Sequence, residues 1–398
     1  MKKLLFSVCF IISLVGSSAE TFTFKFTLGE KYRFITTVDE KVYRDGRLTN
    51  TADFLTKVTY HVTGVTGGSG SIIAHYQVSV RKNNDLGGYT TEDEADSFFT
   101  ISPRGAHTVG PRYLYPLTRN IPLFPEGDVK PGDTWNAPGE EIHDLHQHYG
   151  IPEPFHVPVN VQYTFLGTKT VNGRRVAQID IRYSFMTKVQ GVTITGHFYP
   201  TMIYGNSRKL YAWDAAAGRL VSYEEEFDVF YNLSDGTVAE FTGKHAGNVI
   251  LAQPLDTTET VRDINKTIEK EKIEGVKVEG VKEGVKITLE DIQFQPNSDI
   301  ITRAEARKIE TIAAILKKYP ERDVKLVGHT AAVGTPESCL DLSIRRAKSV
   351  GDALLKLRAH NPDQMTVQGK GLTEPVADNR TEAGRARNRR VEVIILEN

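Results

Sequence analysis

The last third of the chain alternates between strand patterns and helix patterns, and this order constrains the fold more than any other feature. Residues 285–294 and 324–329 are apolar, β-branched runs of strand length, and each is followed by apolar residues at helical spacing. Two more strand patterns, at 365–368 and 389–396, end the chain. The order β-α-β-α-β-β predicts an α/β domain over residues 285–398, with a mixed sheet and helices on one face.

The first helix of this domain has recognisable start and stop signals. Thr302 and Glu305 have the spacing of a capping box, in which both side chains satisfy free backbone donors. Pro320 cannot continue a helix. The sequence therefore predicts a helix between these residues.

Two segments of the domain carry motifs. The first reads Val-Gly-His-Thr-Ala-Ala-Val-Gly from Val327 to Gly334, and Leu-Ser-Ile-Arg-Arg-Ala follows from Leu342. The second reads Asn-Arg-Thr-Glu-Ala-Gly-Arg-Ala-Arg-Asn-Arg-Arg-Val-Glu-Val from Asn379. In order and spacing these segments resemble the C-terminal, peptidoglycan-associated domain of the OmpA family. The resemblance covers little more than a quarter of the chain.

The resemblance implies a binding site where the second strand ends and the second helix begins. In the family, this site holds the diaminopimelate side chain of uncrosslinked peptidoglycan, a zwitterion that a carboxylate and a guanidinium match in charge. Arg346 stands at the position expected to bind the ligand carboxylate. The resemblance also implies that Asn379, Gly384, Asn388 and Arg389 brace the binding face. The candidate ligand-binding residues are Thr330, Ala331, Gly334, Cys339, Leu342, Ser343, Arg346, Asn388 and Arg389.

Two departures from the family pattern affect this site. Ala331 stands where the family has its ligand-binding Asp, and Cys339 stands where it usually has Asn. Removing one partner of a desolvated charge pair costs ~2–5 kcal/mol of binding free energy. Asp341 or Glu337 could substitute only if they reach the site, which their spacing does not establish. We therefore expect peptidoglycan binding to be weakened or lost; the alternative is a genuine peptidoglycan tether through Arg346.

The region before this domain, residues 20–255, is β-rich. Apolar and polar residues alternate along several segments, starting at 21–28, which is typical of strands with one buried face. This pattern predicts a sandwich or an open barrel, in one unit or in two units at 20–140 and 150–255 that the Pro- and His-rich stretch 138–158 would separate. Charges on both faces of the early segments disfavour a barrel that crosses a membrane.

Residues 256–284 differ in composition from both neighbours. Residues 257–272 are charged, lack a sustained apolar stripe and predict an exposed helix. The sequence Glu-Gly-Val-Lys then occurs three times, starting at Glu274, Glu279 and Glu283. A short repeat of low complexity is typical of a spacer between domains.

The first residues predict export. Lys2 and Lys3 precede an uncharged apolar run at 4–15, and small residues end at Ala19, so residues 1–19 have the pattern of a cleaved signal peptide. Of the two cysteines, Cys9 and Cys339, cleavage leaves one, which cannot form an internal disulfide. The formal net charge of -1 predicts no nucleic-acid partner. We expect a periplasmic protein associated with the outer membrane.

A histidine cluster offers a different hypothesis. His143, His146 and His148 are residue types that bind transition metals, and they would support a metal-dependent enzyme in the β-rich region. The simpler interpretation is a solvated polar loop, because ligand types alone leave the geometry unspecified. We therefore predict a non-enzymatic envelope protein without a cofactor, whose β-rich region engages an unidentified protein or small ligand.

Overall fold

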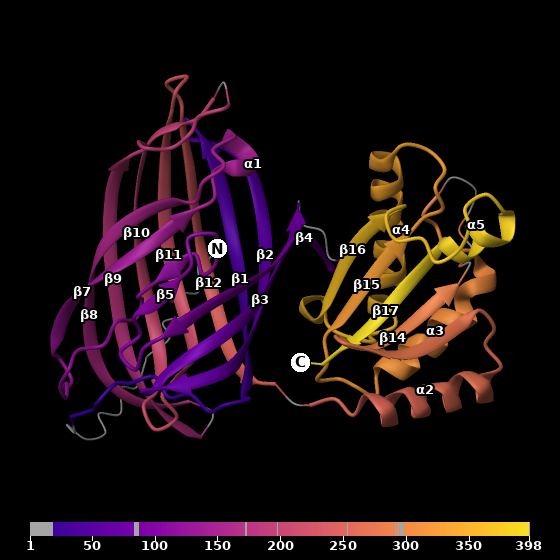
Figure 1. The fold of residues 1–398 in the computed structure, drawn as a ribbon, viewed down its shortest axis with the longest axis horizontal. Coiled ribbons are helices and arrows are strands. Elements are labelled where there is room, and N and C mark those ends of the chain that lie inside the picture. The colour runs from indigo at the N-terminus through magenta and orange to yellow at the C-terminus, as the bar shows by residue number, and fades with distance from the viewer. Residues whose placement is uncertain are drawn as a thin grey trace, which may run out of the picture.

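The computed structural model describes residues 19–397 except 83–86, 172, 197, 253, 291, 293 and 295–297. The predicted signal peptide lies outside the described residues, apart from Ala19. Figure 1 shows a large curved sheet built by the N-terminal part of the chain, beside a smaller sheet that helices cover.

The N-terminal strands form one antiparallel sheet in the spatial order β5-β4-β3-β2-β1-β12-β11-β10-β9-β8-β7-β6. No pairing among the described residues joins β5 to β6, so the sheet is curved but not closed. A short helix, α1 (His146–Tyr149), links β7 to β8. The strands are β1 (Lys31–Arg44), β2 (Arg47–Thr66), β3 (Ser69–Lys82), β4 (Tyr89–Ile101), β5 (His107–Val109), β6 (Thr118–Arg119), β7 (Thr134–His143), β8 (Phe155–Val171), β9 (Arg174–Lys188), β10 (Pro200–Asp214), β11 (Arg219–Leu233) and β12 (Val238–Leu251).

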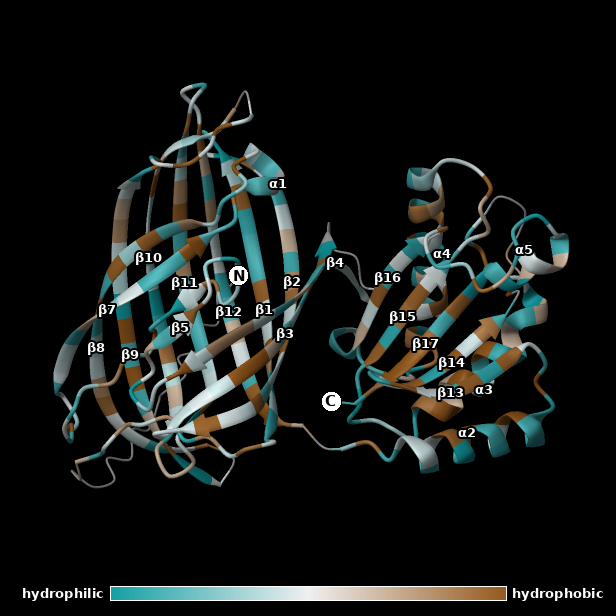
Figure 2. Ribbon diagram, viewed as in Figure 1, coloured by the Kyte–Doolittle hydropathy of each residue, from teal (hydrophilic) through white to brown (hydrophobic). Residues whose placement is uncertain are grey.

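Period-two alternation explains why these strands curve around a core. Along β8, every second side chain from Phe155 to Phe165 is buried, and the residues between them are exposed or half-buried. Figure 2 shows the same alternation of hydrophobic and hydrophilic residues along the long strands. The buried face carries two hydrophobic clusters, one around Trp213 and Tyr163 and the other around Tyr76 and Phe99. The β-rich prediction is therefore confirmed, as a single curved sheet.

Two details of the prediction for this region are wrong. The stretch 138–158 does not separate two units, because β7 and β8, on either side of α1, pair directly from Thr134–Thr164 to His143–Phe155. Residues 21–27 are extended but belong to no strand. Phe22 and Phe24 pack on the core at the open side of the sheet, and Phe24 lies edge-on to Trp213 at 4.8 Å. Alternation predicts an extended chain with one buried face, and it does not identify a hydrogen-bonded neighbour.

The C-terminal sheet has the order β13-β14-β17-β15-β16, and only β15 and β16 run parallel to each other within it. Apolar side chains from one face pack against α2, α3 and α4, which confirms the predicted mixed sheet covered on one side. No helix in the described part of the chain is long and apolar enough to cross a membrane. The elements are α2 (Thr257–Glu271), β13 (Val276–Val281), β14 (Gly284–Glu290), the 3-10 helix η1 (Arg303–Glu305), α3 (Ala306–Leu316), β15 (Val324–His329), α4 (Pro336–Lys356), the 3-10 helix η2 (Pro362–Gln364), β16 (Met365–Gly371), α5 (Glu382–Asn388) and β17 (Arg390–Leu396).

The segments predicted as an exposed helix, 257–272, and as a spacer between domains, 274–286, are both part of the C-terminal domain. Helix α2 buries Ile264 and Ile268 in the C-terminal core, because two apolar residues four apart suffice to hold one face of a helix against it. The Glu-Gly-Val-Lys repeat forms the hairpin of β13 and β14, since its valines alternate with charged residues at strand spacing. The predicted capping box is also absent: Thr302 makes no side-chain capping bond, and its hydroxyl is buried without a partner in the described part of the chain.

The two sheets meet through a short parallel pairing and buried charges. Thr366 and Val367 of β16 pair with Tyr89 and Thr90 of β4, as Figure 1 shows where β4 points toward β16. Beside this pairing, Lys325 Nζ donates to Glu94 Oε1 at 2.8 Å. The sequence contains no local pattern for this contact, because its partners lie more than 200 residues apart.

Candidate functional site

The predicted site is built at the end of β15, where the chain turns into α4. Gly334 has a φ of +106°, a backbone conformation that is strained for any residue with a side chain. This conformation allows the loop to turn into the helix. Thr335 then caps α4, since its hydroxyl accepts a hydrogen bond from the amide of Ser338 at 3.2 Å. Thr330 is tied to the next strand by its amide, which donates to the carbonyl of Gly371 at 2.9 Å. The loop between Thr330 and Thr335 is therefore held at both ends.

Cys339 holds the middle of this loop. Its side chain is 2% exposed, and its Sγ lies 3.3 Å from the carbonyl oxygen of Val333 and 3.8 Å from that of Ala331. A thiol is a weak donor, so these contacts orient the loop with little energy. Ser343, one turn along α4, donates to the carbonyl of Leu340 at 2.7 Å and accepts from the amide of Gly371 at 3.0 Å. Leu342, which lies between Cys339 and Ser343 in the sequence, is half-buried.

Asn388 braces the same loop from α5. The Asn388 side chain is fully buried, and its Oδ1 accepts from the amides of Val376 and Ala377 at 2.8 and 3.0 Å. Its Nδ2 donates to Asn379 Oδ1 at 2.9 Å, and this oxygen also accepts from the amide of Ala332 at 3.0 Å. One continuous hydrogen-bond network thus connects α5 to the candidate site.

Arg346 projects from α4 toward Phe294, with its guanidinium carbon 4.7 Å from the ring centre. Its Nε is buried and has no hydrogen-bond partner in the described part of the chain. Burial, and then the nearby charges of Arg389 and Arg345, lower the pKa of Arg346, while Asp299 acts in the opposite direction. The guanidinium stays charged at neutral pH, so it can accept an anionic ligand group.

Ala331 brings no carboxylate to this loop, and Asp341 and Glu337 are the two acids proposed as its substitutes. The Ala331 side chain is buried and nonpolar. Of the two proposed substitutes, Asp341 pairs with Arg345 at 2.9 Å along α4, and Glu337 is exposed in the first turn of the helix. Arg389 pairs with Glu382 at 3.0 Å. The two arginines nearest Arg346, Arg345 and Arg389, are therefore each paired with an acid.

Sequence reasoning missed Phe294 and Asp299, which lie before α3 and act on Arg346. The aromatic residue at the end of the first strand pattern was visible, but strand alternation does not indicate which helix it will face.

The predicted metal ligands are not brought together. His143 ends β7 with its side chain buried, its Nδ1 lies 2.8 Å from Tyr231 Oη, and its Nε2 lies 3.4 Å from Glu141 Oε2. His146 and His148 are exposed on α1. The chain turns after β7, so the first histidine faces inward and the other two face solvent. No group of three or more His, Cys, Asp or Glu residues within the described ranges is arranged to hold a metal ion.

Comparison with known proteins assigns the domain that carries Arg346. Residues 293–389 match the OmpA family. The chain is 31% identical over 136 residues to Probable lipoprotein YiaD of Escherichia coli, a match that covers 33% of this chain and 62% of the relative. It is 34% identical over 104 residues to Peptidoglycan-binding protein ArfA of Mycobacterium bovis, covering 26% of this chain and 32% of the relative. These matches span less than two thirds of either relative.

A solved structure of an outer membrane protein from Borrelia burgdorferi B31 is also similar. It shares 33% sequence identity with the matched part, at a TM-score of 0.26, and the match covers 30% of this chain and 96% of that one.

Proposed function

Residues 293–389 form an OmpA-family domain, and from this we propose that the protein is a non-enzymatic structural or binding protein of the cell envelope. In this proposal the protein is exported to the periplasm and associates with the outer membrane. Its OmpA-family domain faces the cell wall with a diaminopimelate site that keeps the guanidinium and lacks the carboxylate. Two of its relatives are named as a probable lipoprotein and a peptidoglycan-binding protein, which supports an envelope role.

The observation that carries the incomplete-site proposal is the pair Ala331 and Arg346. Arg346 offers a charged group whose Nε has no partner among the residues that the structure describes, while the methyl of Ala331 offers nothing to a ligand ammonium. Asp341 and Glu382 are paired with arginines, Glu337 is exposed, and Asp299 acts on Arg346 itself. A diaminopimelate end would bury its ammonium unpaired, which costs ~2–5 kcal/mol of binding free energy. Ordinary peptidoglycan binding is therefore weakened by roughly 30-fold or more.

One observation favours a second candidate, a peptidoglycan tether that uses Arg346 alone. The guanidinium has retained its free donor and its ring contact with Phe294 rather than forming an internal ion pair among the described residues. A charged, partly desolvated guanidinium binds a carboxylate well. In this alternative, the domain recognises the carboxylate of the wall peptide and tolerates the loss of the ammonium contact.

Co-sedimentation with purified diaminopimelate-type peptidoglycan separates the two candidates. The chain from Glu20 is compared with its Ala331→Asp and Arg346→Ala variants. The proposal expects the native chain to stay in the supernatant and Ala331→Asp to pellet. If the native chain pellets and Arg346→Ala releases it, the protein is a tether and the incomplete-site proposal is wrong. Arg345→Ala is the matched control, because Arg345 is the adjacent arginine and pairs with Asp341 on the exposed side of α4.

A further inference from the structure

The inside of the N-terminal sheet contains a cavity of about 530 Å³ that the proposed function does not use. It lies between the two hydrophobic clusters, with Val58 and Tyr76 from one cluster and Tyr211 and Trp213 from the other in its wall. Protein interiors are close-packed and rarely keep voids larger than a water molecule. A mostly apolar cavity of this size lies within the range of small-molecule sites.

The cavity extends along β11. On β11 alone, its wall includes Arg219, Tyr223, Glu225, Phe227 and Val229. Ten residues of a strand span roughly 30 Å, and the alternate residues from Tyr223 onward share the inner face. A volume of about 530 Å³ distributed over such a length fits a chain better than a compact ring system.

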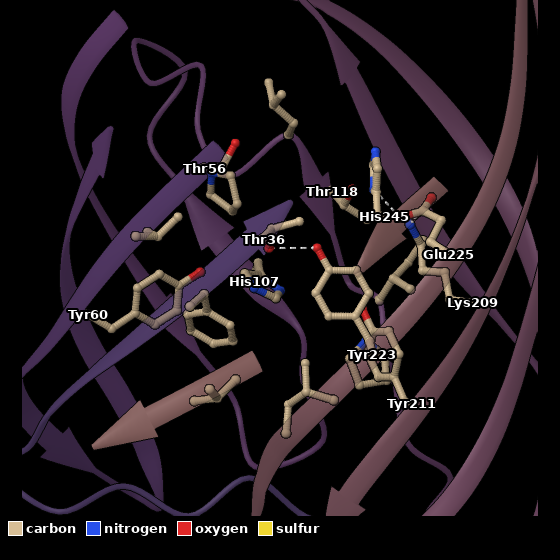
Figure 3. Close-up of a pocket in the computed structure, with 18 of the residues that line it drawn as sticks. Thr36, Thr56, Tyr60, His107, Thr118, Lys209, Tyr211, Tyr223, Glu225 and His245 are labelled. Carbon is tan, nitrogen blue, oxygen red and sulfur yellow. Dashed lines mark hydrogen bonds and ion pairs between the residues drawn. The ribbon is translucent and has the colours of Figure 1, made fainter. Parts of the chain in front are cut away.

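Several polar groups in the wall pair with one another, as Figure 3 shows for Thr36 with Tyr223 and for Glu225 with His245. Glu225 forms an ion pair with Lys209, lies 2.8 Å from His245 Nδ1, and accepts a hydrogen bond from Ser207. Thr36 and Tyr223 bond to each other at 3.0 Å. These groups therefore present no unpaired charge to an apolar ligand that passes them.

One end of the cavity is different, because it has donors without partners. Trp213 is fully buried, and its Nε1 has no hydrogen-bond partner among the described residues. Arg219, also in the wall, donates from Nη1 to Glu30 at 2.8 Å, but its buried Nε has no partner within the described ranges. Lys25 lines the same end, where its amide donates to the carbonyl of Gly218. Arg219 and Glu30 form an ion pair here, and Lys25, whose ammonium donates to the carbonyls of Ala215 and Ala216, adds one further positive charge. This end therefore complements an anionic group.

We propose that this cavity binds a single-chain amphiphile, with its hydrocarbon tail along β11 and an anionic carboxylate or phosphate head at Arg219 and Trp213. The tail is held by apolar burial along the wall. The head supplies the acceptors that the indole N–H and the guanidinium lack. The proposal concerns the N-terminal sheet alone, so the outcome of the peptidoglycan co-sedimentation experiment does not affect it.

Fluorescence of Trp213 tests the proposal directly. The chain has two tryptophans, and Trp135 lies outside the cavity wall, with its Nε1 bonded to the carbonyl of Leu123 at 3.0 Å. In the chain from Glu20, Trp135→Phe makes Trp213 the reporter. Laurate, dodecyl phosphate and 1-dodecanol, each below its micelle concentration, share one tail and differ in the head. We expect saturable fluorescence changes, with both anions binding on the order of tenfold tighter than the alcohol.

Two further variants separate the head from the tail. Arg219→Gln should remove the preference for the anions on the order of tenfold while dodecanol still binds. Val58→Phe with Val78→Phe fills the cavity and should abolish the response. Val65→Phe is the matched control, because Val65 is on the same strand as Val58 but 41% exposed and outside the cavity wall. Circular dichroism checks that each variant is folded, and Arg219→Gln remains informative if the filled variant is not.

Three results would overturn the proposal: no saturable response to any of the three probes, equal affinity for laurate and dodecanol, or unchanged binding by the folded, cavity-filled variant. A parallel titration with lysophosphatidylglycerol assigns the source of the head. Tighter binding of laurate indicates a free fatty acid, and tighter binding of the lysolipid indicates a phospholipid-derived ligand. Both support the proposed class.

Discussion

Arg33 of β1 donates a hydrogen bond from Nη2 to Oδ2 of Asp323 at 2.5 Å, and both side chains are almost completely buried. The two residues belong to different sheets, because Asp323 immediately precedes β15. Lys57 of β2 lies 2.8 Å from the same oxygen. One carboxylate of the C-terminal domain therefore pairs with two cations on the outer face of the N-terminal sheet, and this contact joins the domains together with the β4–β16 pairing.

Asp323→Ala is expected to separate the domains. It leaves Arg33 and Lys57 buried without an anion, and breaking a buried pair from one side costs ~3–5 kcal/mol. Small-angle X-ray scattering should report a larger radius of gyration, and urea should unfold the variant at a lower concentration. Asp352→Ala removes a half-exposed pair with Lys348 on α4 and should change the stability by less than about 1 kcal/mol. An unchanged scattering profile for Asp323→Ala would show that the β4–β16 pairing alone holds the domains.

The contact of Asp323 with Arg33 and Lys57 should depend on pH. Burial alone would raise the pKa of Asp323, but the charges of Lys57 and then Arg33 outweigh it and lower the pKa. A carboxyl with a lowered folded-state pKa stabilises the fold above its unfolded pKa, about 3.9, and this stabilisation is lost as the pH falls through the folded value. Scattering across a pH series should show compact domains at neutral pH that separate only below about pH 4. Separation already at pH 6 would identify another group, such as a histidine, as the cause.

Glu40 should lower the stability of the protein at alkaline pH. Burial raises its pKa to about 7. Between the unfolded pKa, near 4.3, and this value the folded state binds a proton that the unfolded state releases, so the free energy of unfolding falls as the pH rises. Glu40→Gln should therefore be more stable than the native chain at pH 8, by about 2 kcal/mol after allowance for solvent screening, and equal to it at pH 4.

Urea unfolding of Glu40→Gln at the two pH values checks this expectation. Glu224→Gln is the control, because Glu224 is an exposed glutamate on the neighbouring part of the same sheet. A stabilisation of equal size at both pH values would mean that the effect does not come from the titration of Glu40.

Asn388→Ala should loosen the loops that form the candidate site. It leaves the amides of Val376 and Ala377 without their acceptor and frees Asn379 from its donor. Losing several buried hydrogen bonds costs about 3 kcal/mol. Hydrogen exchange should accelerate at Val376, Ala377 and Ala332. Asn361→Ala, at the exposed start of η2, is the matched control; equal protection in both variants would contradict the bracing role.

Cys339 should be unreactive in the folded protein. Its thiol is 2% exposed, and thiol reagents need access to a thiolate. In the chain from Glu20, a chromogenic disulfide reagent should react slowly under native conditions and rapidly in concentrated guanidinium. Fast reaction of the folded chain would mean that the loop over Cys339 opens readily.

The amino-acid sequence by itself determined the local elements of the protein. The strand at 324–329 was predicted at its exact bounds, because a short apolar, β-branched run leaves few alternatives. The alternation of apolar and polar residues predicted that residues 20–255 are β-rich. The spacing of the motifs predicted which residues lie near Arg346 in the chain. Helix α5 and strand β13 were missed, because one is short and polar and the other lies in a repeat that reads as low complexity.

The tertiary structure alone decided which of these elements meet. Residues far apart in the chain form the contact of Arg33 with Asp323, the ring contact of Arg346 with Phe294, and the inward turn of His143 away from His146 and His148. The cavity along β11 also arises only when the sheet curves. Local patterns record which face of an element is buried. The partner that buries it is set by packing over the whole chain, which no local window contains.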